Sequence, residues 1–181
     1  MLHVLKHQVG QFRRDETGLG TIEFVFVVPV FMFLFTMAFE FGIWHTRQTM
    51  LDHGLDRTVR EVRVGKITEP NHGDLINEVC SFAGIIPDCA NQLRLQMFVA
   101  DVDNIAAQIG SDFECRDRTE PDTEPLLEFV NTGENNQLML LRACALLDPF
   151  LPSFGIGKDI EEGQGFYTLT ATASYVLEPI D

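Results

Sequence analysis

One ionisable side chain stands at the mouth of a long apolar stretch. Residues 16–33 read ETGLGTIEFVFVVPVFMF, which places Glu23 five positions after Gly18 and directly before a run of Phe and Val. A carboxylate beside hydrocarbon is costly unless it is paired, so an ionisable residue at such a position is a candidate for a functional role. The chemistry open to Glu23 is charge pairing with a cation. The alternative is a glutamate that only reaches the membrane interface from the first turn of a helix, where the helix dipole favours negative charge.

Four cysteines follow this stretch, namely Cys80, Cys89, Cys115 and Cys144. An even number of cysteines in an otherwise ordinary domain is consistent with disulfides formed in an oxidising compartment, which predicts export of this part of the chain. Four cysteines allow three connectivities, and their order along the chain favours Cys80 with Cys89 and Cys115 with Cys144. Free buried thiols remain an alternative. A zinc site is disfavoured, because no C-x-x-C pair and no H-x-x-x-H partner stands at ligand spacing.

Motifs for enzymatic chemistry are incomplete. FGIGKD resembles a phosphate-binding loop, but Pro152 stands where the first glycine of G-x-x-x-x-G-K-[ST] belongs, and Asp159 replaces Ser or Thr. DVDNIAAQIGSD resembles a calcium loop, but Ile105, Ala106 and Asp112 occupy positions that require Asp or Asn, Gly and Glu. No G-x-S-x-G is present, and no histidine falls among the expected strands. We therefore expect no enzyme, no cofactor and no metal.

The net charge of -14 is distributed unevenly along the 181 residues. Residues 1–66 contain 8 Lys and Arg against 7 Asp and Glu, whereas residues 67–181 contain 5 against 20. The acidic C-terminal part would repel nucleic acid, and no basic stripe interleaved with aromatic residues occurs, so we expect no nucleic-acid partner. The length and the apolar content are sufficient for one compact domain with its own core.

The element that carries Glu23 has the length of a membrane-spanning helix. Residues 24–39 have no charge, and the window 19–44 reaches the length of about 20 residues that crosses a ~30 Å hydrocarbon core. Glu23 and Glu40 then lie near its two ends, with Trp44 as an interfacial anchor. Apolar residues on every face disfavour a buried core helix. The length and the missing A-x-A-like site disfavour a cleaved signal peptide.

Pro29 and the membrane orientation are two further features of this helix. Pro29 has no N–H for the helical ladder and should kink or loosen the helix near Val25. The orientation is left open by loop charge, because the Lys and Arg residues beyond the span outnumber those before it. Only the cysteines favour export of the C-terminal part.

Beyond the span the apolar pattern becomes one-sided. Leu51, Leu55, Val59 and Val62 recur at spacings of four, four and three, which predicts an amphipathic continuation of the same helix to about Val64. Gly54 lies inside this pattern and weakens the case for strict continuity.

Alternating segments further along the chain predict strands at 92–101 (QLRLQMFVAD), 137–147 (QLMLLRACALL) and 167–177 (YTLTATASYVL). We expect the first strand to be half-buried, with Leu and Met opposite Arg94 and Gln96. We also expect a short helix at 74–83, a Pro- and Asp-rich loop at 116–125 and a Gly-rich loop at 154–165. The fold class is therefore α+β, with a long N-terminal helix packed on a small antiparallel sheet of three or four strands.

The segment around Gly18 resembles the processing site of type IV pilins and pseudopilins, with basic and polar residues before it and the apolar helix after it. TGLGTIEFVFVVPVF, with its Glu-Phe pair and a proline six residues after Glu23, is most similar to the TadE-like pseudopilins of tight-adherence (Tad/Flp) pilus systems. GIWHTRQTMLDHGLDRTVREVR, LRACALLDPFLP and TLTATASYVLEP are also similar to parts of that family. The related TadF type stays open as an alternative.

This resemblance implies a pilin-like fold that is processed and assembled. A prepilin peptidase would cut between Gly18 and Leu19, and Glu23 would register each subunit by neutralising the new amine of a neighbour. The implied parts are a cytoplasmic leader at 1–18, a transmembrane helix at 19–44, its amphipathic continuation at 45–66 and an acidic exported domain at 67–181.

The implied role is that of a minor pseudopilin in the assembly or initiation of a Tad/Flp pilus for adherence. Its partners would be the prepilin peptidase, other Tad pilins and pseudopilins, and the Tad inner-membrane platform. The chain would be a single-pass protein of the bacterial inner membrane with its C-terminal domain in the periplasm, or part of a cell-surface pilus.

The sequence departs from the family pattern at two places. Leu19 replaces the usual Phe or Met, so methylation of the new N-terminus is not implied, and Asp15 and Glu16 lie beside the cut. Two alternatives therefore remain: an uncleaved, membrane-anchored periplasmic adaptor of a secretion or pilus apparatus, and a membrane-tethered enzyme or metal-binding protein.

Overall fold

The computed structural model describes residues 19–67, 71–105, 108, 113, 115, 137–163 and 165–176. By its internal contacts the chain divides into two units, Met1–Phe39 and Glu40–Asp181. The boundary between them falls inside the first described helix, five residues before Trp44. The Pro- and Asp-rich loop expected at 116–125 lies outside the described residues.

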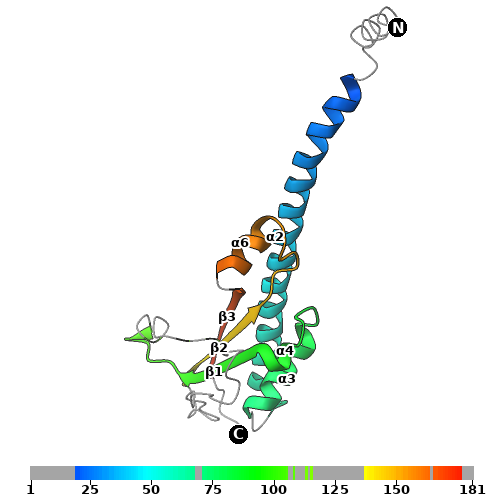
Figure 1. Ribbon diagram of the computed structural model, residues 1–181. Coiled ribbons are helices and arrows are strands. Elements are labelled where there is room, and N and C mark those ends of the chain that lie inside the picture. Colours follow the sequence, from blue (N-terminus) through cyan, green and yellow to red (C-terminus); the bar gives the residue numbers. More distant parts are fainter. Residues whose placement is uncertain are drawn as a thin grey trace, which may run out of the picture. The chain divides into compact units, whose positions relative to one another are not determined.

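The long helix α2, Leu19–Arg63, is continuous, as the sequence predicted (Figure 1). It runs through both Pro29 and Gly54 without a break. Its end is a Schellman motif, in which the N–H of Lys66 donates to the carbonyl of Glu61 at 3.0 Å and the N–H of Gly65 donates to that of Val62 at 3.1 Å. Gly65 has a φ of 72°, a left-handed conformation that glycine adopts without a steric penalty.

The second unit contains a three-stranded antiparallel sheet in the order β1-β2-β3. The strands are β1 (Leu93–Val99), β2 (Leu138–Leu147) and β3 (Tyr167–Val176). Leu93 pairs with Ala145 at one end of the first ladder, and Tyr167 pairs with Leu147 in the second. All three strands were predicted from alternation, and the α+β class is confirmed.

One face of the sheet and the second half of α2 share a single core. The predicted stripe of α2 is buried there, with Leu51 and Leu55 at most 1% exposed. The helix α3 (His72–Phe82) joins the same core through Leu75 and Val79, and Asn71 caps it by accepting from the N–H of Asp74 at 2.8 Å. Helix α3 corresponds to the helix expected at 74–83.

The prediction that β1 is only half-buried was wrong. Arg94 and Phe98 point away from the main core but are 9% and 7% exposed, and Phe98 packs with Leu140 in a second cluster. Residues that follow β1 in the chain cover this face: the Arg142 guanidinium lies 4.7 Å from the centre of the Phe113 ring. Alternation in a strand shows only which residues share a face, not how much chain returns over each face.

The prediction of a Gly-rich loop at 154–165 was also wrong, because residues Gly155–Gly163 form the helix α6. Helix α4 (Cys89–Gln92) was not expected either. A Cβ on Gly157 would lie 2.2 Å from the carbonyl oxygen of Leu151, so glycine is required there for close packing against the preceding loop. Tertiary packing thus overrides the low helix propensity of glycine.

Candidate functional site

The residues proposed for processing and registration lie at the start of α2. Gly18 is outside the described residues, and Leu19 is the first residue of the helix. Glu23 is exposed, and among the residues that the structure describes its carboxylate has no hydrogen-bond or ion-pair partner. The first turn of α2 contains no acidic residue, and the dipole effect falls off within that turn. The helix dipole therefore gives Glu23 little compensation.

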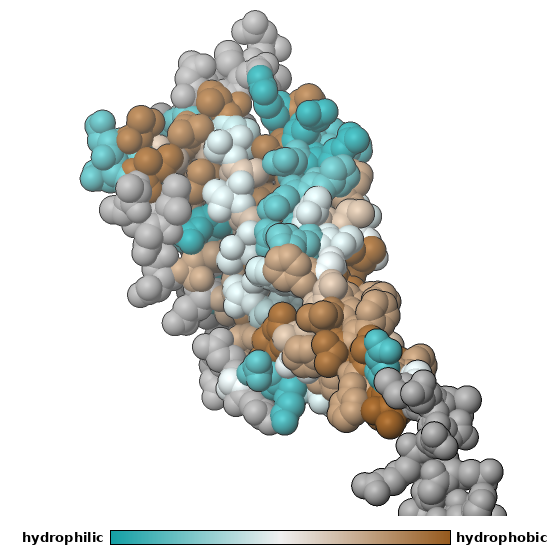
Figure 2. Space-filling model, turned by 90° about the horizontal axis from the view of Figure 1, so that it is seen from above, coloured by the Kyte–Doolittle hydropathy of each residue, from teal (hydrophilic) through white to brown (hydrophobic). Residues whose placement is uncertain are grey.

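The apolar side chains around Glu23 are exposed to an unusual degree. Phe24, Phe26 and Phe31 are 66%, 71% and 62% exposed, and surface side chains of this hydrophobic kind are drawn in brown in Figure 2. Helix α2 is long and apolar enough to cross a membrane, and none of its most apolar 18-residue window is buried. A core helix of a soluble domain would bury this window, whereas a membrane anchor or a signal sequence would not.

A buried carboxylate begins the second unit. Glu40 is 5% exposed; its Oε1 accepts from the N–H of Phe150 at 2.7 Å and its Oε2 accepts from the N–H of Leu151 at 2.9 Å. Sequence reasoning placed Glu40 at the membrane interface and missed this contact. The two backbone donors compensate for the burial of the charge, because charge-assisted hydrogen bonds are the strong ones.

Two further polar side chains of α2 bind the strands. Arg47 donates to the hydroxyl of Tyr167 and, at 3.3 Å, to the carbonyl of Asp148. Gln48 donates to the carbonyl of Thr170 at 2.8 Å. Burial raises the pKa of Tyr167, so its hydroxyl stays protonated at neutral pH, although the bond from Arg47 opposes this shift. Together with Glu40, these side chains fix one turn of α2 after another against β3 and the β2–α6 loop.

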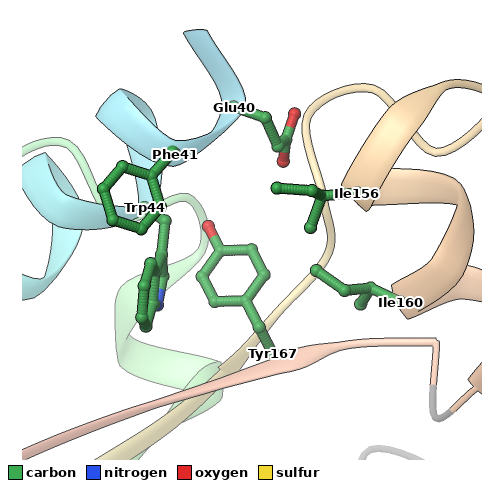
Figure 3. A pocket seen from close by; sticks show the side chains of 6 residues that line it. All are labelled: Glu40, Phe41, Trp44, Ile156, Ile160 and Tyr167. Atoms are coloured by element: carbon green, nitrogen blue, oxygen red, sulfur yellow. The ribbon is translucent and has the colours of Figure 1, made fainter. Parts of the chain in front are cut away.

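An apolar pocket of about 320 Å³ lies beside Glu40 (Figure 3). Its walls come from α2, α6 and the start of β3, and the lining residues are Glu40, Phe41, Trp44, Ile156, Ile160 and Tyr167. The rings of Phe41 and Trp44 lie 5.6 Å apart. Both oxygens of Glu40 accept backbone N–H groups, and the remaining lining is mostly apolar, so the pocket can hold an apolar group.

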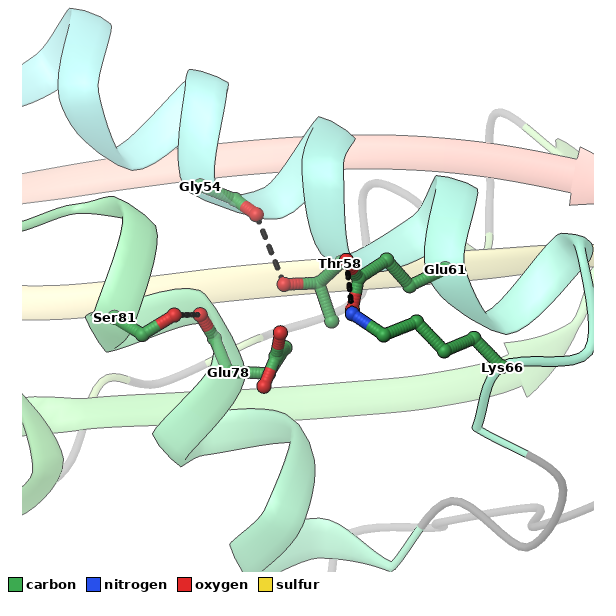
Figure 4. A network of polar contacts seen from close by, with 6 residues as sticks. All are labelled: Gly54, Thr58, Glu61, Lys66, Glu78 and Ser81. Carbon is green, nitrogen blue, oxygen red and sulfur yellow. Dashed lines mark hydrogen bonds and ion pairs between the residues drawn. The ribbon is translucent and has the colours of Figure 1, made fainter.

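A second polar cluster ties the end of α2 to α3 (Figure 4). Lys66 Nζ lies 2.7 Å from Oε1 of Glu61, and Glu78 of α3 is the carboxyl next to this pair. The bond from Lys66 holds the pKa of Glu61 below its ordinary value, whereas the neighbouring carboxylate of Glu61, with burial, raises the pKa of Glu78. Oε2 of Glu61 is buried and has no donor among the described residues, so protonation of Glu78 would supply one.

In both cysteine pairs that the order in the chain favours, the two cysteines are joined. Cys80 is joined to Cys89 with the Cα atoms 5.7 Å apart, and Cys115 is joined to Cys144 with the Cα atoms 5.2 Å apart. The first bridge connects α3 to α4, and the second fastens the chain over the outer face of β2. In the described part of the chain, His, Cys, Asp and Glu side chains do not gather in groups of three that could hold a metal ion.

The comparisons with known proteins bear on the N-terminal half. The chain combines one long apolar helix with an α+β domain, and a protein of this class can be anchored in a membrane by its single helix. Within that class, residues 18–60 match a family model described as TadE-like protein, over 43 of the 181 residues. The match confirms the TadE-like resemblance and is consistent with a TadE-like protein of the Tad pilus system. No curated protein and no solved structure matches the chain.

Proposed function

We propose that this protein is a minor pseudopilin that takes part in the assembly or initiation of a Tad-type pilus. The observation that carries the proposal is the position of the TadE-like match, which begins at Gly18 and includes Glu23, Pro29 and the exposed apolar part of α2. The work of such a protein is assembly. We therefore propose a role in assembly and not in catalysis.

The proposed assembly step follows from the chemistry at the start of α2. A prepilin peptidase cuts after Gly18 and leaves a new α-amine on Leu19. Glu23 is four residues further on, about 6 Å along a helix axis at ~1.5 Å per residue. In a low-dielectric surrounding, a carboxylate without a partner favours a nearby cation strongly, so the amine of a neighbouring subunit pairs with Glu23 and sets the register.

The proposed location is the bacterial inner membrane, with the second unit in the periplasm. An exposed apolar helix, an acidic domain and two bridges between cysteines all suit an anchored domain in an oxidising compartment. The proposed partners are the prepilin peptidase, other Tad pilins and pseudopilins, and the inner-membrane platform of the system.

Replacement of Glu23 tests the registration role. Glu23→Val should leave membrane insertion and cleavage intact, because it removes only a charge from the apolar segment, while pilus assembly is lost. Asp56→Asn is the matched control, because it removes an exposed carboxylate from the same helix outside the apolar run and should leave assembly intact. Assembly is measured as sheared pilus protein at the cell surface. Wild-type amounts of pili from the Glu23→Val strain would refute the registration role.

A further inference from the structure

Five apolar side chains near Glu40 remain exposed although each belongs to the folded second unit. They are Phe41 at 49%, Trp44 at 38%, Phe150 at 53%, Phe154 at 46% and Ile156 at 37% exposed. Phe41, Trp44 and Ile156 also line the pocket, so its walls are partly open to the surroundings. We refer to these five residues as the aromatic collar.

Backbone contacts hold the collar together. Glu40 accepts the N–H of Phe150, which holds the backbone of Phe150 at the Glu40 side chain. Glu40 also accepts the N–H of Leu151, and the carbonyl of Leu151 accepts the N–H of Phe154 at 3.3 Å. The close approach of Gly157 to the same carbonyl fixes the start of α6 and with it Ile156. These contacts hold the segment that carries Phe150, Phe154 and Ile156 at the Glu40 turn of α2.

The size and the place of the collar indicate its partner. With about 200 Å² for each large side chain, the exposed fractions amount to roughly 450 Å², which is comparable to the largest apolar patch of a typical soluble monomer, and such patches are often functional. Phe41 and Trp44 lie two and five residues after the end of the uncharged run 24–39 of the same helix, with Glu40 between. Aromatic side chains are enriched where a spanning helix leaves the hydrocarbon and enters the headgroup layer.

We propose that the aromatic collar rests in the interfacial layer of the bilayer that α2 crosses, so that the domain is seated on the lipid surface. This inference depends on the proposed membrane anchor. Lipid accounts for the collar better than a second copy does, because Phe41 and Trp44 lie on the same helix within five residues of the end of the uncharged run 24–39. Both oxygens of Glu40 accept hydrogen bonds from backbone donors inside the domain, so this side chain is not exposed at the level of the collar.

Fluorescence of single tryptophans in the full chain tests the proposal. Trp44 is the single tryptophan of the sequence, so Trp44→Phe gives a background without signal. Into this background Phe154→Trp, Phe31→Trp and Val102→Trp are introduced one at a time. Each protein is reconstituted in vesicles of phosphatidylethanolamine and phosphatidylglycerol, with and without lipids brominated near the headgroup.

Val102→Trp is the matched control for an exposed position away from the collar. Val102 is 73% exposed and lies three residues after Val99, the last residue of β1. Val99 pairs with Met139 of β2, and Met139 pairs with Tyr175 of β3, so Val102 lies near the Tyr175 end of the sheet. The collar lies near Tyr167 at the opposite end of β3, about 26 Å from Tyr175 at ~3.3 Å per residue. Phe31→Trp reports whether α2 itself is in the bilayer.

The expected result is blue-shifted emission at position 154 and quenching by brominated lipid several-fold stronger than at position 102. Quenching at position 31 but not at 154, with water-like emission at 154, would show that α2 is in the bilayer and that the collar does not contact lipid. This result would overturn the proposal for the collar and support the membrane anchor. Absence of quenching at both positions would overturn the anchor and the collar together. Blue-shifted, unquenched emission at 154 that depends on the protein-to-lipid ratio would also overturn it, in favour of a second copy.

Discussion

The contact between Glu40 and the loop after β2 gives the sharpest test of how the domain is held to α2. Glu40→Ala leaves the N–H groups of Phe150 and Leu151 without their acceptor. A buried donor that loses its partner costs about 2 kcal/mol, so the two together cost up to about 4 kcal/mol. Because Phe150 is 53% exposed, water can reach part of this loop, and we expect a destabilisation of about 2 to 4 kcal/mol.

Glu40→Gln refines the same prediction. Glutamine keeps one acceptor oxygen but presents an NH₂ group to the second backbone donor, so we expect about half the loss of the alanine variant. The control is Asp56→Asn, which removes an exposed carboxylate from the same helix and should leave stability within about 0.5 kcal/mol of wild type.

The assay is urea unfolding of the full chain in detergent micelles, followed by the emission of Trp44. This residue lines the pocket beside Glu40 and therefore reports on the contact directly. The expected order of midpoints is wild type and Asp56→Asn highest, then Glu40→Gln, then Glu40→Ala. If Glu40→Ala unfolds at the midpoint of Asp56→Asn with unchanged Trp44 emission, the reasoning about a buried, bound carboxylate is refuted.

Two other predictions concern the junction of α2 and α3. Gly54→Ala should destabilise the domain by about 1 to 3 kcal/mol in the same assay, because the new Cβ would lie 2.8 Å from the carbonyl oxygen of Val79. Gly42→Ala, with no atom within 4 Å of the added Cβ, should be neutral or stabilising by up to about 1 kcal/mol, and equal effects at both sites would contradict the packing argument. Glu78→Gln should raise the urea midpoint at neutral pH but not near pH 4, at about the ordinary carboxyl pKa. Because the pKa of Glu78 is raised in the folded state, protonated Glu78 stabilises the fold below the ordinary carboxyl pKa. This contribution is lost as the pH rises through the pKa of Glu78 in the folded protein. An equal gain in the urea midpoint at both pH values would contradict a proton shared with Glu61.

The elements whose pattern depends on one face were predictable from the sequence. The spacing from Leu51 to Val62 and the alternation from Leu169 to Tyr175 both identify residues that share the main core. Their burial follows from the helical and strand periods, which is why the boundaries of α2 and β3 agree closely with the predictions. The role of Gly54 was harder to predict from the sequence, because only the close approach of α3 explains a glycine within a continuous helix.

Features that depend on distant segments were not predictable in the same way. Helix α6 is held by packing of Gly157 on Leu151 and of Ile156 and Ile160 at the pocket, none of which a Gly-rich local sequence indicates. The burial of Glu40 depends on backbone donors 110 and 111 residues away. A signal was present all the same: a glutamate at the end of an apolar run requires a partner, and sequence reasoning applied this argument only to Glu23.

The central claim is that the chain is cut after Gly18 so that Leu19 becomes the amine-bearing residue of an assembly-competent subunit. Mass spectrometry of the N-terminus, on protein purified from its native membrane, tests it most directly. We expect a mature chain that begins at Leu19 in cells with the prepilin peptidase and at Met1 in cells without it. A chain that begins at Met1 in peptidase-competent cells would contradict the pseudopilin account and favour an uncleaved membrane-anchored adaptor.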